Sequence, residues 1–249
     1  MKTVRTLVAQ PHTALRELAA LVALYALYEV FRGFADGTLE LARRHTEQIV
    51  ALERSAGIFW EREIQRFAEA VPSLPMLLGV AYIVLHFGAT TVALVWVYRR
   101  HRAHFALVRT TLVVSTAIAL TIYVAYPAAP PRLAALGFSD TVSTHAGVNL
   151  SSDLLGSLYN PFAAVPSLHF GYALLVGVVV ARLAGSRSWR LVGGLYAPFV
   201  LFVIVATGNH FVLDAAAGGA VTTVGWLLAR PLAAPRLARS ARPHHLPAG

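Results

Sequence analysis

Long apolar blocks alternate with short polar segments along this chain of 249 residues. A helix needs about 20 apolar residues to cross the hydrocarbon core of a membrane, and six blocks approach that length. The pattern therefore predicts an all-α integral membrane protein with six transmembrane helices. The predicted spans cover approximately residues 15–34, 74–97, 105–126, 168–184, 190–207 and 211–229.

One segment between the first two predicted spans has a different pattern. Residues 44–70 place apolar side chains at roughly helical spacing with charges between them, which is typical of an amphipathic helix. We predict an interfacial helix here, although a cap packed on the transmembrane helices fits the pattern equally well. The apolar positions are Ile49, Leu52, Ile58, Phe59, Ile64 and Phe67.

The spans predict a single membrane domain over residues 1–230, followed by a short tail. Residues 231–249 are rich in Pro, Ala and Arg, so we expect a disordered cytoplasmic tail. The chain is 57% hydrophobic and 13% charged, whereas soluble domains carry about 25% charge. It has no cysteine, which excludes disulfides and thiolate metal sites.

The basic residues predict the orientation of the chain in the membrane. The formal net charge of +9 would suit nucleic acid if it formed one polar face, but the basic residues lie between apolar blocks. With six spans, fourteen of the twenty-one basic residues fall on one side. That side is normally cytoplasmic. We therefore expect a multi-pass cell-membrane protein with both termini in the cytoplasm and no nucleic-acid partner.

The third predicted span ends at residues 126–133, YPAAPPRL, because its prolines cannot continue a helix. Arg132 stands in this segment, and a guanidinium offers a planar set of donors that suits phosphate. Taken alone, the residue is better explained as an interfacial arginine that extends toward lipid headgroups.

The fourth predicted span is introduced by residues 160–173, NPFAAVPSLHFGYA. Pro166 suits a first helical position, so Ser167 and the backbone N–H groups of the first turn would face the outer aqueous edge. A helix N-terminus attracts anions through these donors and its dipole. His169 lies in the same turn. A capping serine beside an interfacial histidine is the alternative interpretation.

The last two predicted spans meet at residues 206–214, ATGNHFVLD. His210 and Asp214 are four residues apart, so on a helix they share one face. A carboxylate bonded to one imidazole nitrogen fixes the tautomer and leaves the other nitrogen available to attack. The alternative is a buried His–Asp pair that joins two helices, although an aspartate inside a span seldom serves structure alone.

These groups are all predicted at the extracytoplasmic face, and together they suit phosphoryl transfer. That reaction needs a nucleophile, an acid for the leaving oxygen and fixed positive groups for the other oxygens. The combination of Pro-Arg, Pro-Ser-x-His and His-x-x-x-Asp resembles the type 2 phosphatidic acid phosphatase superfamily over about residues 105–229. The resemblance implies a six-helix membrane enzyme that cleaves lipid phosphates or diphosphates without a metal or other cofactor.

The resemblance also implies a role for each matched residue. His210 would be the nucleophile that forms a phosphohistidine, and Asp214 would orient it. His169 would protonate the leaving oxygen. Ser167 and Arg132, with backbone N–H groups, would bind the phosphoryl oxygens.

Three positions depart from the family pattern. Ala125 stands where the family has a lysine, Ile204 stands where it has an arginine, and Leu133 follows the first motif where it has a proline. The Tyr-Pro-x-x-Pro-Pro stretch and the Gly-x-His sequence are instead similar to the inositol phosphorylceramide synthase branch. Uncharged donors are candidate replacements for the missing cations: Tyr126, Asn209 and Thr207.

The leading interpretation is an enzyme acting on a lipid or isoprenoid phosphate, a diphosphate or a phospholipid. Attack of water on the phosphohistidine would release phosphate, whereas a polyol or other alcohol would accept the phosphoryl group. A less charged pocket suits a phosphodiester. Two other classes stay open. One is a zinc-dependent hydrolase with His169, His210 and Asp214 as ligands, although it lacks a His-Glu-x-x-His sequence. The other is a non-catalytic protein that binds or transports lipid phosphates.

Overall fold

The computed structural model describes residues 38–145 and 160–240, together with Ala19 and Ala26, and it describes side chains as far as Ala233. The span predicted over residues 15–34 therefore lies outside the described residues, except for those two alanines. In the part of the chain that the structure describes, every named element is helical, which confirms the all-α prediction there.

Four helical segments of the described residues are long and apolar enough to cross a membrane. They coincide with the second, third, fifth and sixth predicted spans, with ends that differ by a few residues. The fifth starts earlier than predicted because the Ser186 side chain accepts a hydrogen bond from the N–H of Trp189 and caps the helix. The four segments are Leu74–Arg100, Arg102–Ala125, Arg187–Ala206 and Val212–Ala233.

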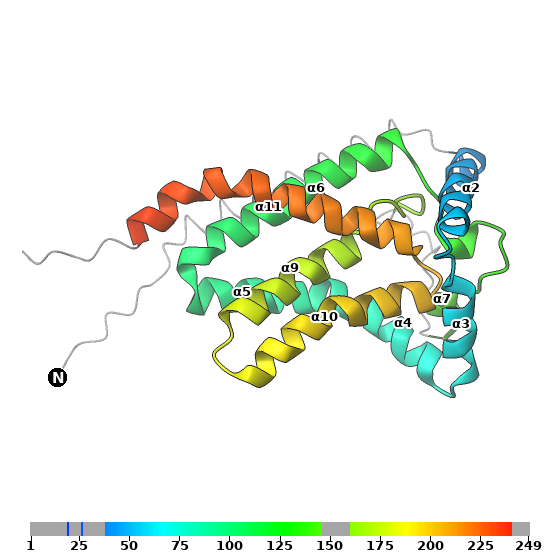
Figure 1. Cartoon of the computed structure of the whole chain (residues 1–249), viewed down its shortest axis with the longest axis horizontal. Coiled ribbons are helices and arrows are strands. Elements are labelled where there is room, and N and C mark those ends of the chain that lie inside the picture. The colour runs from blue at the N-terminus through cyan, green and yellow to red at the C-terminus, as the bar shows by residue number, and fades with distance from the viewer. Residues whose placement is uncertain (1–18, 20–25, 27–37, 146–159, 241–249) are drawn as a thin grey trace, which may run out of the picture. The chain divides into compact units, whose positions relative to one another are not determined.

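The first of these segments is not a uniform α-helix, because a π-helical turn interrupts it. In Figure 1, α6 runs beside α11, and α9 runs beside α10. Two short elements, η2 (Pro131–Leu133) and α7 (Thr141–His145), lie in the connection between α6 and α9. The long segments consist of α4 (Leu74–Val84), η1 (Leu85–Ala89), α5 (Thr90–Arg100), α6 (Arg102–Ala125), α10 (Arg187–Ala206) and α11 (Val212–Ser240).

The prediction of six transmembrane helices is thus confirmed for four. The fourth predicted span is α9 (Leu168–Leu183), a helix of 16 residues. At 1.5 Å per residue it is about 24 Å long, shorter than a hydrocarbon core of ~30 Å. Its start is set by Ser167, the N-cap. The segment before this residue is therefore not part of the helix, and its Ala164 contacts Ala128 and His210 instead.

The C-terminal end of α11 differs from the predicted boundary of the membrane domain at residue 230. The helix continues to Ser240 and includes Pro231 and Pro235; the leucines, alanines and arginines around these prolines favour a helix. The predicted disorder from residue 231 is therefore corrected as far as Ser240. Residues 241–249 lie outside the described part of the chain.

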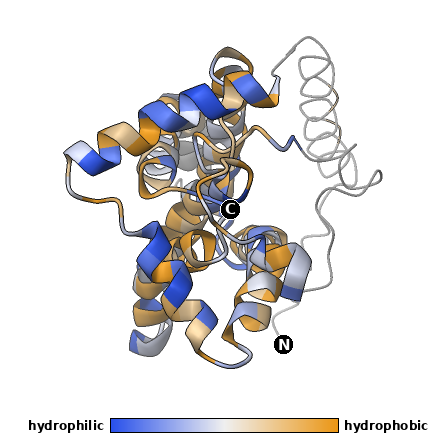
Figure 2. Cartoon of the chain, turned by 90° about the vertical axis from the view of Figure 1, so that its right-hand side faces the viewer, coloured by the Kyte–Doolittle hydropathy of each residue, from blue (hydrophilic) through white to orange (hydrophobic). Residues whose placement is uncertain are grey.

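The amphipathic segment forms two helices rather than one. They are α2 (Leu39–Ser55) and α3 (Glu61–Ala70), and the turn between them contains Gly57 at φ +71°. Both lie across one end of the long helices (Figure 1), where α2 contacts α11 and α3 contacts α10. Figure 2 looks onto this end and shows hydrophilic and hydrophobic residues alternating on the nearest helices. The segment therefore packs as a cap, while Leu52, Trp60 and Phe67 stay exposed.

A close crossing of α9 and α11 brings the second and third sequence motifs together. A Cβ atom on Gly218 would collide with the carbonyl oxygen of Ser167, and one on Gly171 would collide with the Thr222 hydroxyl and the Gly218 backbone. Glycine is therefore required at these positions for the two backbones to approach.

We expect Gly218→Ala to destabilise the protein, since the added methyl group has no space at the crossing. Overpacking of this kind costs about 1–3 kcal/mol, which corresponds to a Tm lowered by ~2–4 °C for each kcal/mol. The measurement is thermal unfolding in detergent. Gly194→Ala is the control, because a Cβ there meets nothing within 4 Å. Equal Tm values for the two variants would show that the crossing tolerates a side chain.

Candidate active site

His210 lies in the turn between α10 and α11 and is almost fully buried. Its Nδ1 atom is 3.1 Å from the carbonyl oxygen of Ala164 and 3.4 Å from Oδ2 of Asp214. Both neighbours are acceptors, so Nδ1 carries the proton and Nε2 keeps its lone pair. The geometry therefore prepares Nε2 for nucleophilic attack.

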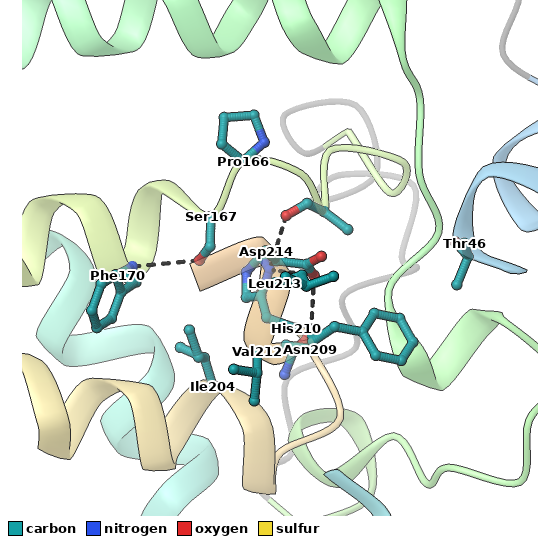
Figure 3. Close-up of polar contacts among 12 residues, drawn as sticks. Thr46, Pro166, Ser167, Phe170, Ile204, Asn209, His210, Val212, Leu213 and Asp214 are labelled. Atoms are coloured by element: carbon teal, nitrogen blue, oxygen red, sulfur yellow. Dashed lines mark hydrogen bonds and ion pairs between the residues drawn. The ribbon is translucent and has the colours of Figure 1, made fainter. Parts of the chain in front are cut away.

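Asp214, in the first turn of α11, connects the two sequence motifs (Figure 3). The side chain is fully buried, and its Oδ2 atom accepts a hydrogen bond of 2.9 Å from the N–H of Phe211. Its carbonyl oxygen accepts one of 2.8 Å from the N–H of Ser167. The residue thus orients His210 with its carboxylate and holds the start of α9 with its backbone.

His169, in the first turn of α9, faces the same place. Its ring centroid lies 5.6 Å from that of His210, with an interplanar angle of 53°. The ring also stacks on Tyr82 at 4.3 Å. The separation of the two imidazoles is short enough for both to contact one phosphoryl group. The structure therefore brings His169, His210 and Asp214 together.

His86 is a third histidine at this site, which the sequence analysis did not single out. It lies in the π-helical turn η1 and stacks on His169 at 3.9 Å and on Tyr172 at 5.3 Å. Such turns are frequent at functional sites. A titratable residue inside a predicted span was the available signal, but the π-turn that directs it to His169 is not visible in the sequence.

Arg132 is held beside the third motif by its own backbone. It lies in η2, and its N–H donates a hydrogen bond of 3.0 Å to the carbonyl oxygen of Gly208, two residues before His210. Its Nε atom is 3.5 Å from Oδ2 of Asp140. Asp140, which the sequence analysis did not identify, therefore orients the guanidinium.

Ser167 caps α9, because its hydroxyl oxygen accepts a hydrogen bond of 3.4 Å from the N–H of Phe170. The residue is fully buried. The first N–H groups of a helix have no carbonyl partner within the helix. The start of α9 therefore presents donors beside His169, where the helix dipole also favours an anion.

Tyr126, the first candidate replacement donor, points to α2. Its hydroxyl lies 3.1 Å from the carbonyl oxygen of His45 and 2.9 Å from Oε1 of Gln48, and its ring stacks on that of His45. Burial raises the pKa of Tyr126, and the negative charge of Asp214 contributes to the increase. The residue therefore joins the end of α6 to the cap.

Asn209 and Thr207, the other two candidates, shape the turn that carries His210. The amide of Asn209 donates to the carbonyl and hydroxyl oxygens of Thr207, at 3.3 and 2.9 Å. The Thr207 hydroxyl donates to the carbonyl oxygen of Val203 at 2.8 Å. Both residues are buried, so in this structure their donors hold the turn together.

Two buried glutamates beside the site were also missed. Glu53 of α2 accepts a hydrogen bond of 2.7 Å from the N–H of Leu213, and Glu61 of α3 accepts one of 2.9 Å from the N–H of Val212. Carboxylates of the protein thus accept hydrogen bonds from the N–H groups at the start of α11. In the sequence both glutamates belong to the polar positions of an amphipathic segment, so nothing marked them as buried.

The zinc-dependent interpretation requires His169, His210 and Asp214 to point at one centre. Among the residues that the structure describes, no group of three or more His, Cys, Asp or Glu side chains is arranged to hold a metal ion. The Nδ1 atom of His210 faces a carbonyl and a carboxylate oxygen instead. The donor geometry therefore does not support that interpretation.

Comparison with known proteins agrees with the site geometry. The family model of the PAP2 superfamily matches residues 47–228, more than half of the chain. A phosphoinositol dihydroceramide synthase from Bacteroides thetaiotaomicron is 28% identical over an alignment of 127 residues, and the match covers 42% of this chain and 39% of that protein. The chain thus matches well under half the length of this relative. No solved structure matches the chain.

We expect Ser167→Ala to lower the free energy of unfolding by about 0.5–2 kcal/mol, because the N–H of Phe170 loses its acceptor. Ser167→Gly should cost only a few tenths of a kcal/mol, since glycine is tolerated as an N-cap. Chemical denaturation in detergent micelles measures both. An equal loss of stability in the two variants would contradict the capping role. Binding of inorganic phosphate by the same variants is a separate measurement, and an equal loss of affinity in both would reveal that the hydroxyl binds ligand.

Proposed function

Because the chain belongs to the PAP2 superfamily, we propose that it transfers a phosphate-linked headgroup between lipids through a phosphohistidine intermediate. Membership and the four apolar helices make it an integral membrane protein of a lipid phosphatase and phosphotransferase family. The observation that carries the proposal is the placement of two imidazoles 5.6 Å apart, with Asp214 beside the Nδ1 atom of one of them.

In the first step, the Nε2 atom of His210 attacks the phosphorus of a phosphodiester. A bond forms between nitrogen and phosphorus, and the bond from phosphorus to the leaving oxygen breaks. His169, in its imidazolium form, gives its proton to that oxygen. The phosphorylated ring of His210 becomes positively charged, and the neighbouring carboxylate of Asp214 stabilises that charge.

In the second step, the hydroxyl oxygen of an acceptor attacks the same phosphorus. His169 takes the hydroxyl proton, the bond from nitrogen to phosphorus breaks, and His210 returns to its neutral form. An alcohol as acceptor gives a new phosphodiester, and water gives a phosphomonoester or free phosphate. Arg132, the Ser167 hydroxyl and the N–H groups at the start of α9 would hold the phosphoryl oxygens.

The low positive charge of the site favours transfer of a diester over hydrolysis of a monoester. Ile204, which stands where the family has an arginine, is fully buried. Arg132 lies beside the carboxylate of Asp140, which offsets part of its charge. A diester carries one negative charge and a monoester carries up to two, so a site with fewer cations suits the diester. The partial similarity to a headgroup synthase points the same way. Hydrolysis of a lipid or isoprenoid phosphate is the second candidate.

We propose that the site opens to the extracytoplasmic face, with both termini in the cytoplasm. Arginines concentrate at the ends of the long helices away from His210. Arg99, Arg100 and Arg102 surround the junction of α5 and α6, and Arg187 starts α10, whose other end leads to His210. Basic ends of transmembrane helices normally stay in the cytoplasm.

The deciding experiment supplies purified protein in detergent with phosphatidylinositol, lipid monophosphates and prenyl diphosphates, with and without ceramide or diacylglycerol as acceptor. We expect a new phosphodiester that depends on the acceptor and is absent with His210→Ala. Free phosphate in place of the diester would identify a phosphatase. Turnover that survives in His210→Ala would refute the phosphohistidine, and no turnover with any substrate would favour a binding protein.

The roles of the two histidines can be separated with leaving groups of different basicity. His169→Ala should slow the first step by about 10²–10⁴-fold with an alkyl diester, because general acid catalysis contributes that much. With a p-nitrophenyl diester the loss should be small, since nitrophenolate leaves without a proton. Rapid-mixing measurement of nitrophenol release checks this. His210→Ala should abolish both reactions, and equal losses in His169→Ala for the two substrates would contradict the assigned role.

A further inference from the structure

The two glutamates of the cap have no part in the chemistry above, although both are fully buried beside it. Three consecutive backbone N–H groups at the start of α11 are bound by three different carboxyl groups. Phe211 donates to Asp214 at 2.9 Å, and the next two donate to the glutamates. Two of these acceptors come from α2 and α3, more than 150 residues earlier in the chain.

We propose that Glu53 and Glu61 share one proton and act as a pair of positioning residues for the nucleophile. As a carboxylic acid bonded to a carboxylate, the pair would hold the first turn of α11 so that Asp214 and His210 keep their alignment. This inference rests on the proposed function for its catalytic consequence, but not for the existence of the pair.

The number of charges at this helix start supports a shared proton. Backbone N–H groups and the helix dipole stabilise one negative charge well. Three carboxylates around a single buried turn would repel one another strongly, because charges interact more strongly away from water. With one shared proton, the pair of glutamates carries one negative charge in place of two.

The surroundings of Glu53 agree with this assignment. Burial raises the pKa of Glu53 to about 8; the N–H of Leu213 opposes the increase, and Glu61, followed by Asp214, adds to it. A hydrogen bond that protonated Glu53 donates to the carboxylate of Glu61 contributes in the same direction. The Oε2 atoms of both glutamates are buried away from solvent.

Other charged or titratable groups also belong to the elements that carry or contact the two glutamates. From α11 and the turn before it come Asp214 and His210, which face each other. The arginines that follow the glutamates in sequence, Arg54 and Arg62, lie over the rings of Phe59 and Phe138.

The pair affects catalysis because His210 lies outside both α10 and α11. It stands in the short turn that ends where α11 begins, so its ring moves with the first turn of that helix. A displacement of about 1 Å in a reacting group can lower a rate ~10²-fold. Ionisation of Glu53 would place two carboxylates against each other and push the cap away from α11.

The first test measures thermal unfolding of the full-length protein in detergent and needs no activity. A group whose pKa is higher in the folded state stabilises the fold at low pH and loses that contribution as pH rises. The change should lie between about pH 4.5, the ordinary pKa of a glutamate, and about pH 8, the pKa of buried Glu53. Glu53→Gln keeps the shape and a donor but cannot ionise. Its Tm should therefore rise relative to the wild type between pH 5 and pH 8, and the difference should stay constant above pH 8.

The second test compares the pH profiles of turnover with a phosphodiester. The wild type should lose kcat near pH 8, whereas Glu53→Gln should keep its kcat both near pH 7 and near pH 8. Glu53→Ala should lower kcat at least tenfold with little change in KM, because the N–H of Leu213 at the start of α11 loses its acceptor. A wild-type profile unchanged by Glu53→Gln would overturn the catalytic part of the inference.

The two tests separate failure of the inference from failure of the proposed function. If the Tm difference between Glu53→Gln and the wild type does not depend on pH, the shared proton is refuted whatever the protein catalyses. If the Tm difference follows pH but no phosphodiester is turned over, the pair stands and the proposed function fails.

Discussion

The hydrogen bond from the N–H of Ser167 to the carbonyl oxygen of Asp214 is the contact on which the site depends. It joins the residue that caps α9 to the first turn of α11. His169 follows the donor by two residues, and His210 precedes the acceptor by four, so this contact determines how the two imidazoles face each other. Gly218 makes the contact possible, because any side chain there would meet the backbone of Ser167.

The two helix starts at this site pair their backbone donors in different ways. Buried polar groups are costly in an apolar fold unless they are paired. At α11 the protein pairs the donors with its own carboxylates from α2, α3 and α11. At α9 a neutral hydroxyl provides the cap, so the first turn remains available to an external anion. The cap formed by α2 and α3 therefore determines which of the two helix starts has its donors paired within the protein.

Much of the fold could be predicted because a membrane requires long apolar helices, and four such segments appear where the pattern places them. His169, His210, Asp214 and Arg132 could be proposed because titratable residues near apolar runs are costly without a role. The start of α9 was predicted correctly, and the helix ends at Leu183, one residue before the predicted boundary. The helical continuation of α11 past residue 230 was missed because composition was taken to indicate disorder.

The sequence by itself determined the all-α membrane architecture and the chemical types of the principal site residues, because both follow from local patterns of polarity and spacing. Only the tertiary structure decided which groups meet. Glu53 and Glu61 look like ordinary surface positions of an amphipathic segment, and His86 looks like an isolated polar residue in a span. They become part of the site because α2, α3 and a π-helical turn bring them to α9 and α11, and contacts between distant segments leave no trace in local periodicity.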